Sequence, residues 1–328
     1  MPSGLTRREL IIGVGGTSLA VAGCSAGPVA PASPAGDASP DIVIGSMIWN
    51  ASIPFYANFI KGQREQADAL GVTLKLLDGK GSLEAQIAAM EQLITQQVQA
   101  ILVTPSDPAG IAPIVTKAAN AGIPVFAVNN RVDASAPTVT FIGADDVVFG
   151  KQQATLLAQS VPSSARVAYL MGELGTSAQR LRKQGFEQEL AAVSDITIID
   201  EQTSNWDSAK ALSVVQNWLV RYRAGQLDAI VGQGPEAASA ARHAKDIGRT
   251  DVAFIVGDYP VEVRDGIIDG CIVGTVDQDP KPQGTRAVEA AWQWLTGAQD
   301  KVVRPNDYLD LPIVTKDNVD QYPPAWGA

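Results

Sequence analysis

The stretch MIWNASIPFYANFIKGQREQADALG, from Met47 to Gly71, decides how the chain begins to fold. It leaves a β-branched apolar run and enters a pattern of apolar residues spaced three and four apart, which is typical of an amphipathic helix. The loop between these elements holds the side chains Trp49, Asn50, Phe55 and Tyr56. A plain turn needs no large rings, so this loop indicates a role beyond connecting a strand to a helix.

The alternation of strand and helix continues along the chain. Short β-branched runs alternate with helical stretches in a first series, and again in a second series that begins near Arg166. The runs of the first series are IVIGSMI, VTLKLLD, AILVTP and IPVFAVN. Those of the second series are RVAYLMG, ITIIDEQ, AIVGQG, VAFIVGD and CIVGTVDQ. Strands that alternate with crossover helices form parallel sheets covered on both faces, so the pattern predicts an α/β fold with two similar halves.

Polar and aromatic side chains recur where the predicted strands end. In an open parallel sheet the ligand site lies beyond the carboxyl ends of the strands. The candidate ligand-binding residues are Trp49, Asn50, Phe55, Tyr56, Thr104, Asn129, Asn130 and Arg131 in the first half, and Arg182, Trp206, Gln233, Asp258 and Gln278 in the second. Glu236 lies in one of the same loops. Amide, guanidinium and carboxylate groups bond to hydroxyls, and aromatic rings stack on the C–H face of a sugar, so the set predicts a small hydroxylated ligand.

Taken singly, each of these loop residues also has a structural interpretation. Asp107 and Asp279 suit helix caps, and Trp206 suits a packed core as well as a binding site. Only the recurrence at strand ends in both halves favours a ligand site.

Composition excludes several classes of function. The formal net charge of −10 repels nucleic acid, so neither DNA nor RNA is an expected partner. The single histidine, His243, lies in a helical pattern, which excludes an ordinary Ser/His/Asp or Cys/His arrangement and a metal site of several histidines. The adjacent Asp145 and Asp146 suit a connection or hinge better than a metal or acid pair. We therefore expect no catalytic residue, no metal ion and no cofactor, and the chain is not predicted to be an enzyme.

The first residues have the layout of an export signal. Arg7 and Arg8 precede an apolar run from Leu10 to Ala22, and small residues lead up to Cys24. The arginine pair resembles a twin-arginine signal, and VAGC resembles a bacterial lipoprotein cleavage box, which would make Cys24 the lipidated N-terminus of the mature chain. The sequence leaves the twin-arginine and general export routes open.

A linker and a second cysteine fit the same interpretation. Residues 24–40 follow a signal peptide at residues 1–23, and they bury too little apolar surface to fold, so they indicate a flexible tether. If Cys24 carries lipid, Cys271 has no internal partner and no disulfide forms. We expect an exported protein that is periplasmic or anchored by an N-terminal lipid to the outer face of the cytoplasmic membrane.

Landmarks between Asp41 and Val314 together resemble the ribose-binding (type I) periplasmic substrate-binding proteins of sugar ABC transporters, in lipoprotein form. These landmarks are PFYANFIKGQREQADALG, ILVTPSD, IPVFAVNNR, GTSAQRLRKQGF, VGD and DGCIVGTVDQDP. The ending VTKDNVDQY is also frequent in that family. The resemblance implies a monomeric solute-binding protein that captures a monosaccharide or sugar alcohol and delivers it to an ABC permease by hinge closure.

The resemblance also implies two Rossmann-like lobes joined by a three-segment hinge, with crossings near Ala144, Gln278 and Asn306. The N-terminal lobe would comprise residues 41–144 and 279–306, and the C-terminal lobe residues 145–278 and 307–328. Carried over by position, the aromatic pair on the sugar would be Phe55 and Tyr56. The polar contacts would come from Thr104, Asn129 and Asn130 in the first lobe, and the second-lobe set would be Arg182, Trp206, Asp258 and Gln278.

Three departures from the family pattern argue against ribose itself. Asn129 and Asn130 replace the usual Asp-Arg pair, Gly234 replaces a usual Asn, and Ile53 stands where Asn is common. Each unmatched hydroxyl or buried polar group would cost about 1–3 kcal/mol. Another pentose, a hexose, a deoxysugar or a sugar alcohol is therefore expected, with Trp49 or Trp206 filling space that another ligand shape leaves.

Three rival interpretations assume the same two-lobe fold. A sugar-responsive repressor needs a DNA-binding helix-turn-helix where this chain has an export signal. A receptor for a nucleoside, a furanose-like signal or an amino-acid derivative stays open, because Arg131 or Arg182 with Asp258 could hold the two ends of an amino acid. An enzyme on this scaffold is the third, since fold alone does not settle function.

Overall fold

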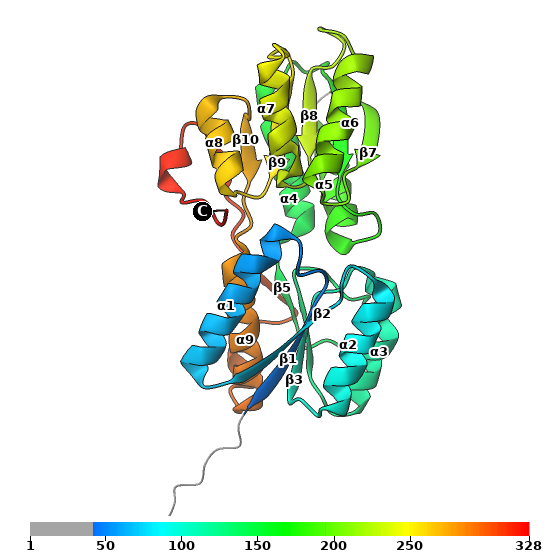
Figure 1. Ribbon diagram of the computed structural model, residues 1–328, viewed down its shortest axis with the longest axis vertical. Helices are drawn as coiled ribbons and strands as arrows, with labels where there is room; N and C mark the ends of the chain where they lie inside the picture. Colours follow the sequence, from blue (N-terminus) through cyan, green and yellow to red (C-terminus); the bar gives the residue numbers. More distant parts are fainter. Residues whose placement is uncertain (1–41, 194, 328) are drawn as a thin grey trace, which may run out of the picture. The chain divides into compact units, whose positions relative to one another are not determined.

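The computed structural model describes residues 42–193 and 195–327. The expected signal peptide (1–23), the lipidated Cys24 and the linker (24–40) lie outside these residues. The described chain forms two α/β lobes, each built on a six-stranded sheet (Figure 1). The predicted α/β class with two similar halves is confirmed.

The first lobe has a parallel sheet in the order β11-β5-β4-β3-β1-β2. Its strands are β1 (Val43–Ile48), β2 (Thr73–Asp78), β3 (Ala100–Val103), β4 (Val125–Val128), β5 (Phe141–Gly143) and β11 (Asn306–Tyr308). Its helices are α1 (Pro54–Leu70), α2 (Leu83–Thr95), α3 (Pro108–Asn120) and α9 (Pro280–Leu295). Ile44 and Ile48 pack with α1 and α9, whereas Met47 and Val103 pack with α2 and α3, so helices cover both faces of the sheet (Figure 1).

The second lobe repeats this plan in the order β12-β10-β9-β8-β6-β7. Its strands are β6 (Arg166–Met171), β7 (Thr197–Thr203), β8 (Ala229–Gly232), β9 (Ala253–Gly257), β10 (Gly274–Val276) and the antiparallel β12 (Ile313–Thr315). Its helices are α4 (Asp146–Ser160), α5 (Ser177–Val193), α6 (Ser208–Arg221), α7 (Ala238–Asp246) and α8 (Val261–Asp269). Short 3₁₀ turns are η1 (Pro235–Ala237), η2 (Gln299–Lys301) and η3 (Val319–Gln321). Tyr169 packs with α4 and α5, and Leu170 packs with α6 to α8, so this sheet is also covered on both faces.

The chain passes between the two sheets three times, after β5, after β10 and after β11. The first two passages fall at residues 144–145 and 277–279, where the sequence suggested crossings near Ala144 and Gln278. The third falls at residues 309–312, later than the position suggested near Asn306. The reason is that Asn306–Tyr308 pairs with β5 and so extends the first sheet before the chain leaves it.

Aspartate caps begin several of the helices. The side chain of Asp107 accepts from the backbone N–H groups of Ala109 and Gly110 at the start of α3, and Asp279 caps α9 in the same way, as the sequence predicted. Asp145 caps α4. α1 begins differently, because Ile53 supplies no side-chain cap and Pro54 takes the first turn. The first backbone N–H groups of α1 therefore have no capping side chain, and this end of the helix meets the site described below.

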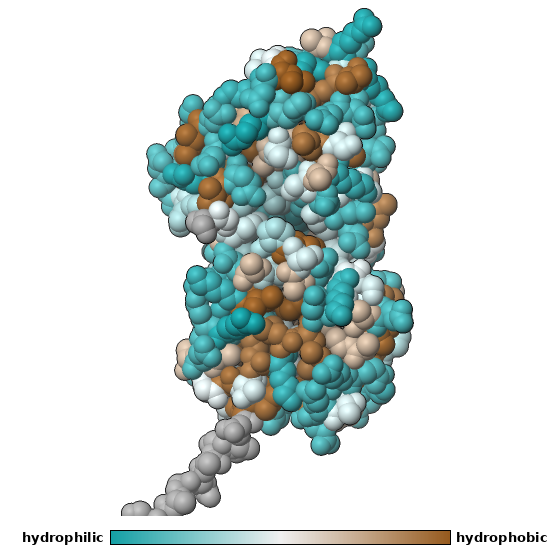
Figure 2. Space-filling model, viewed as in Figure 1, coloured by the Kyte–Doolittle hydropathy of each residue, from teal (hydrophilic) through white to brown (hydrophobic). Residues whose placement is uncertain are grey.

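Exposed apolar side chains occur on both lobes, and Val220 and Ile247 are examples on the second lobe. Figure 2 shows hydrophobic residues gathered between α1 and α2, where the edge strand β2 places the half-buried Leu74 and Leu76. Within the described residues no helix is both long and apolar enough to cross a membrane. Cys271 is a half-buried free thiol, and burial raises its pKa.

Candidate functional site

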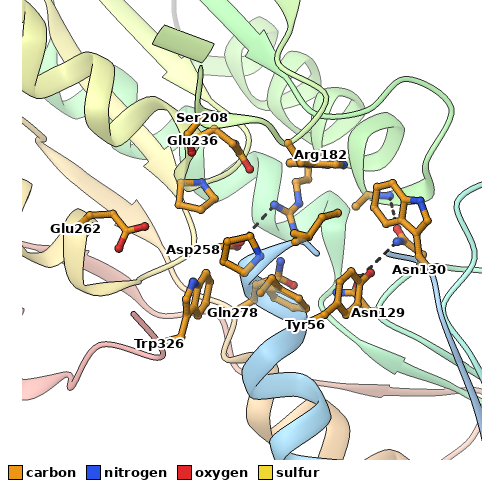
Figure 3. Close-up of a pocket in the computed structure, with 17 residues that line it drawn as sticks. Tyr56, Asn129, Asn130, Arg182, Ser208, Glu236, Asp258, Glu262, Gln278 and Trp326 are labelled. Carbon is orange, nitrogen blue, oxygen red and sulfur yellow. Dashed lines mark hydrogen bonds and ion pairs between the residues drawn. The ribbon is translucent and has the colours of Figure 1, made fainter. Parts of the chain in front are cut away.

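A pocket lies where the carboxyl ends of strands from both sheets meet, and both lobes contribute to its walls (Figure 3). The space between its walls is about 720 Å³, a figure that includes open solvent at its mouth. The residues that line it are Trp49, Ile53, Pro54, Phe55, Tyr56, Asn129, Asn130, Ala178, Arg182, Trp206, Ser208, Pro235, Glu236, Asp258, Glu262, Gln278 and Trp326.

The first-lobe wall is aromatic. Phe55 and Tyr56 lie in the first turn of α1, and their rings meet edge to face with centroids 5.4 Å apart. Trp49 approaches Tyr56 edge-on at 6.4 Å, and Trp326 approaches Phe55 at 5.5 Å. Edge-to-face packing fixes the rings relative to one another while leaving apolar surface towards the pocket. This wall can take the C–H face of a ring-shaped ligand.

Side-chain amides lie beside the aromatic wall. Asn129 has a left-handed backbone (φ 61°), accepts a hydrogen bond from the Tyr56 hydroxyl at 3.0 Å and donates one to Gln283 at 3.1 Å. Burial raises the pKa of Tyr56 far above its ordinary value, so its hydroxyl stays a donor. The Asn130 side-chain oxygen accepts from the Ser177 hydroxyl at 3.2 Å and the Ala178 N–H at 3.4 Å. Asn130 therefore joins the first lobe directly to the start of α5 in the second.

Arg182 is the central cation of the second-lobe wall. Its guanidinium bonds to Asp146 at 2.9 Å and to the Gln233 carbonyl at 2.7 Å, and it lies 3.8 Å from an oxygen of Asp258. The ring of Phe149 lies 3.8 Å from the guanidinium carbon. Only 2% of Arg182 is exposed, so its position is set by α4, α5 and the loops after β8 and β9.

Three carboxyl groups surround this one guanidinium. Burial raises the pKa of Asp258 to about 6 and that of Glu236 to about 8, although Arg182 acts in the opposite direction on both. Burial also raises the pKa of Asp146. The side chain of Glu236 points towards Arg182 and Asp258, and Glu262 reaches in from the side of the pocket (Figure 3). This wall therefore holds more carboxyl groups than basic groups.

Two tryptophans of the pocket have free indole N–H groups. The Nε1 atoms of Trp49 and Trp206 are buried and bond to no partner among the described residues. Trp206 follows β7 in a left-handed turn with Asn205 (φ 59° and 55°), and its ring lies over Gly172, where a Cβ would come within 2.0 Å of it. The backbone at Trp206 is strained, which is common where a structure holds a side chain for binding. Oxygen atoms of a ligand could accept from either indole.

The C-terminal tail also reaches the pocket. The carbonyl of Ala325 accepts from the Asn58 side chain on α1 at 2.7 Å, and the backbone N–H of Ala325 donates to the Tyr259 carbonyl at 2.8 Å. Trp326 lies next in the chain, against Phe55. The tail is thus bonded to both lobes beside the pocket.

The structure brings nine of the sequence-derived candidates into the pocket lining and leaves the four others outside it. The nine are Trp49, Phe55, Tyr56, Asn129, Asn130, Arg182, Trp206, Asp258 and Gln278. Thr104 accepts from the backbone N–H of Trp49, and Asn50 accepts from Ser52. Gln233 is fully buried, and its side chain accepts a hydrogen bond from the backbone N–H of Gly172 and donates one to the Tyr169 hydroxyl.

Arg131 is the fourth residue outside the lining. Its guanidinium donates to Asn306 at 2.9 Å and to the Tyr308 hydroxyl at 2.8 Å, and it lies 4.0 Å from the centre of the Phe141 ring. These partners belong to β5 and β11, so Arg131 is held on the first lobe beside a crossing segment.

Eight lining residues were not among the sequence-derived candidates. They are Ile53, Pro54, Ala178, Ser208, Pro235, Glu236, Glu262 and Trp326. Glu236 could have been selected, because it lies in a strand-end loop. Trp326 had no such signal, because it lies in a tail without periodicity.

Comparison with known proteins gives one family. A model described as the periplasmic binding protein domain matches residues 44–299. The ribose import binding protein RbsB of Escherichia coli is 29% identical over 264 residues, which are 80% of this chain and 87% of the relative. The xylitol-binding protein of Mycolicibacterium smegmatis is 27% identical over 312 residues, which are 94% and 86% of the two chains.

Solved structures agree in fold. An ABC transporter solute-binding protein from Bacillus halodurans with bound myo-inositol is 26% identical and superposes with a TM-score of 0.80 over 86% of this chain and 97% of that chain.

Proposed function

We propose that this chain, which belongs to the family of periplasmic binding protein domains, captures a monosaccharide or sugar alcohol between its lobes and delivers it to an ABC permease. It acts as a binding protein without catalysis, and we propose that it works as a monomer. The ligand class follows the relatives, whose names specify ribose and xylitol, and a similar structure that holds myo-inositol.

The observation that carries this function is the pairing of two different walls around one pocket. Aromatic rings and amides come from the first lobe, and a guanidinium with carboxyl groups comes from the second. A ring-shaped polyol stacks on the first wall and bonds by its hydroxyls to the second. Neither wall alone surrounds a ligand, so binding favours the arrangement in which the lobes meet.

The passages at residues 144–145, 277–279 and 309–312 are the proposed hinge. Closure about these segments would bring the ligand groups of both lobes together and create the surface that a permease recognises. Support comes from the few direct bonds that join the lobes near the pocket, such as those of Asn130 to α5. Equal small-angle scattering profiles with and without ligand would count against hinge closure.

Export and anchoring are proposed from the sequence alone. The signal-like residues 1–23 and the VAGC box support secretion and a lipid on Cys24. A mature protein with an N-terminal diacylglycerol would partition into detergent, and Cys24→Ala would release it to the aqueous phase. A wild-type protein that stays aqueous would contradict the anchor.

An amino-acid ligand receives less support from the geometry. Its carboxylate would need a free guanidinium, and Arg182 already faces Asp146 and Asp258. Arg131 lies outside the pocket lining.

A thermal-shift screen tests the proposed ligand class. Purified protein is heated with pentoses, hexoses, polyols, nucleosides and amino acids, each in excess. A ligand at about 100 times its dissociation constant adds about 2.7 kcal/mol, which raises the melting temperature by several degrees. We expect a shift with a sugar or polyol, and shifts only with nucleosides or amino acids would contradict the proposal.

A further inference from the structure

We propose that the ligand is an amino sugar or amino polyol and that Glu236 receives its positively charged amine. The inference rests on the proposed function, because it names the ligand class for the same pocket. It adds a positive charge to the ligand and gives a role to a residue of a strand-end loop that was not among the candidate ligand-binding residues.

Carboxyl groups outnumber basic groups around the pocket. Asp146, Asp258 and Glu236 are 1%, 5% and 8% exposed, and the only basic side chain among the lining residues of the described chain is Arg182. Arg182 bonds to Asp146 and lies 3.8 Å from Asp258. One cation therefore faces three buried carboxyl groups, and Glu236 is the one without an ion pair in the described chain.

Asp258 keeps a buried acceptor atom free, and the carboxyl group of Glu236 accepts a hydrogen bond from its own backbone N–H. The Oδ1 atom of Asp258 is buried and bonds to no partner among the described residues. Within the same residues, no other side chain donates a hydrogen bond to Glu236, whose carboxyl group points into the pocket (Figure 3). A buried acceptor without a donor is costly, so a ligand that brings several N–H donors gains free energy here.

Gly234 gives Glu236 its position. A Cβ at residue 234 would lie 2.7 Å and 2.8 Å from the two carboxyl oxygens of Glu236. The backbone of Gly234 is extended (φ −136°, ψ −169°), a conformation that any residue adopts, so glycine serves here to leave space. The carboxyl group of Glu236 thus fills the volume that a side chain at position 234 would take.

An ammonium group fits this surrounding better than a hydroxyl group does. It donates up to three charge-assisted hydrogen bonds, which are about twice as strong as neutral ones. It is also attracted to aromatic faces, and Trp206, Trp326 and Phe55 line the same pocket. A neutral polyol could bond to the acceptors but would form no ion pair with Glu236.

The protonation of Glu236 gives a pH signature. The charged groups that act on it are Arg182 from α5, Asp258 after β9 and Asp207 before α6, and burial raises its pKa to about 8. An ammonium ligand requires the ionised carboxylate, so its affinity rises between pH 6 and 8 as Glu236 loses its proton. A neutral ligand bonded by the protonated carboxyl group shows no such rise.

The test uses matched pairs of ligands with and without an amine. Calorimetric titrations compare D-glucose with D-glucosamine, D-galactose with D-galactosamine, and D-glucitol with 1-amino-1-deoxy-D-glucitol, together with myo-inositol and an inosamine. We expect the amine of at least one pair to bind about tenfold or more tightly than its neutral partner at pH 7.5.

Three variants locate the effect. Glu236→Gln should weaken binding of that amine by about tenfold or more and leave its neutral partner nearly unchanged. Gly234→Asn should do the same by displacing the carboxyl group. Asp68→Asn, which removes an exposed charge from the last turns of α1, is the control and should change neither. Melting temperatures without ligand show whether each variant is folded.

The outcomes separate the two proposals. Amine preference that Glu236→Gln removes supports the inference. Equal or tighter binding of the neutral partners, or amine preference that persists in both site variants, overturns it and leaves the proposed function standing. Binding of neither member of any pair, together with binding of a nucleoside or amino acid, overturns both.

Discussion

The two walls of the pocket differ in charge, although both lobes share one fold plan. The first-lobe wall consists of rings and amides, and none of its lining residues is charged. The second-lobe wall places Arg182 among Asp146, Asp258 and Glu236, all almost fully buried. The difference indicates that the first lobe provides rings and neutral hydrogen-bonding groups for the ligand, whereas the second lobe provides the ionisable groups.

The two walls also depend differently on a ligand. Tyr56, Asn129 and Gln283 satisfy one another within the first lobe. In the second lobe an oxygen of Asp258 accepts no hydrogen bond from the described residues, and Glu236 has no ion pair among them. Changes in the second wall should therefore alter the pH dependence of stability as well as affinity, whereas changes in the first should leave the pH dependence unaltered.

The largest expected effect comes from removing the central cation. Arg182→Met leaves the buried Asp146 and Asp258 without their partner, and loss of one member of a buried ion pair costs about 3–5 kcal/mol. Urea unfolding measures the change. Arg180→Met, on the exposed side of α5, is the matched control and should stay within about 0.5 kcal/mol. Equal unfolding of the two variants would show that Arg182 does not organise the charged wall.

Truncating the aromatic wall should chiefly reduce affinity. Phe55→Ala removes the ring between Tyr56 and Trp326, and loss of such a contact weakens binding by about tenfold to a hundredfold. Phe55→Leu keeps much of the volume and serves as the control. Titration with the ligand found in the thermal screen measures both. Unchanged affinity in Phe55→Ala would show that the aromatic wall does not contribute to ligand binding.

The pH dependence of stability tests the charged wall without a ligand. The pKa of Glu236 is raised to about 8 and that of Asp258 to about 6, so the folded state holds protons that the unfolded state has already released. Stability is then greatest below the unfolded pKa values and falls by several kcal/mol as the pH rises towards 8. Glu236→Gln should make the fall in stability between pH 6 and 8 smaller, and Asp277, whose pKa burial also raises to about 8, should account for part of the fall that remains. A wild-type stability that rises over this range would contradict the raised pKa values.

The smallest effect should come from one hydroxyl in the neutral wall. Tyr56→Phe removes the donor to Asn129, whose oxygen keeps a longer contact of 3.4 Å with Asn130. The expected loss of stability is about 1 kcal/mol, without a change in its pH dependence. A loss of stability that varies with pH in this variant would mean that the Tyr56 hydroxyl affects the protonation of the carboxyl groups in the second-lobe wall.

The sequence predicted the fold because its signals are local. β-Branched runs, helical spacing and caps such as Asp107 and Asp279 all act within a few residues. The same locality explains why Phe55 and Asp258 could be selected, since a residue that directly follows a parallel strand is carried to the site edge of the sheet.

Contacts between residues far apart in the chain set the side-chain positions that the sequence did not predict. Arg131 follows β4 as Asn129 and Asn130 do, yet Asn306 and Tyr308 hold its side chain away from the lining. Trp326 enters the pocket only because Asn58 and Tyr259 bind the tail. Such contacts depend on residues far along the chain, and no local pattern records them.

Tryptophan fluorescence titration tests the central claim most directly, because Trp49, Trp206 and Trp326 of the six tryptophans in the chain line the pocket. The wild type and Asp258→Asn are titrated with the sugars, polyols and amino derivatives named above. We predict a saturable change with at least one of them, and an affinity about tenfold or more weaker in Asp258→Asn. Absence of saturation with every compound, or equal affinity in both proteins, would contradict a polyol-binding site between the lobes.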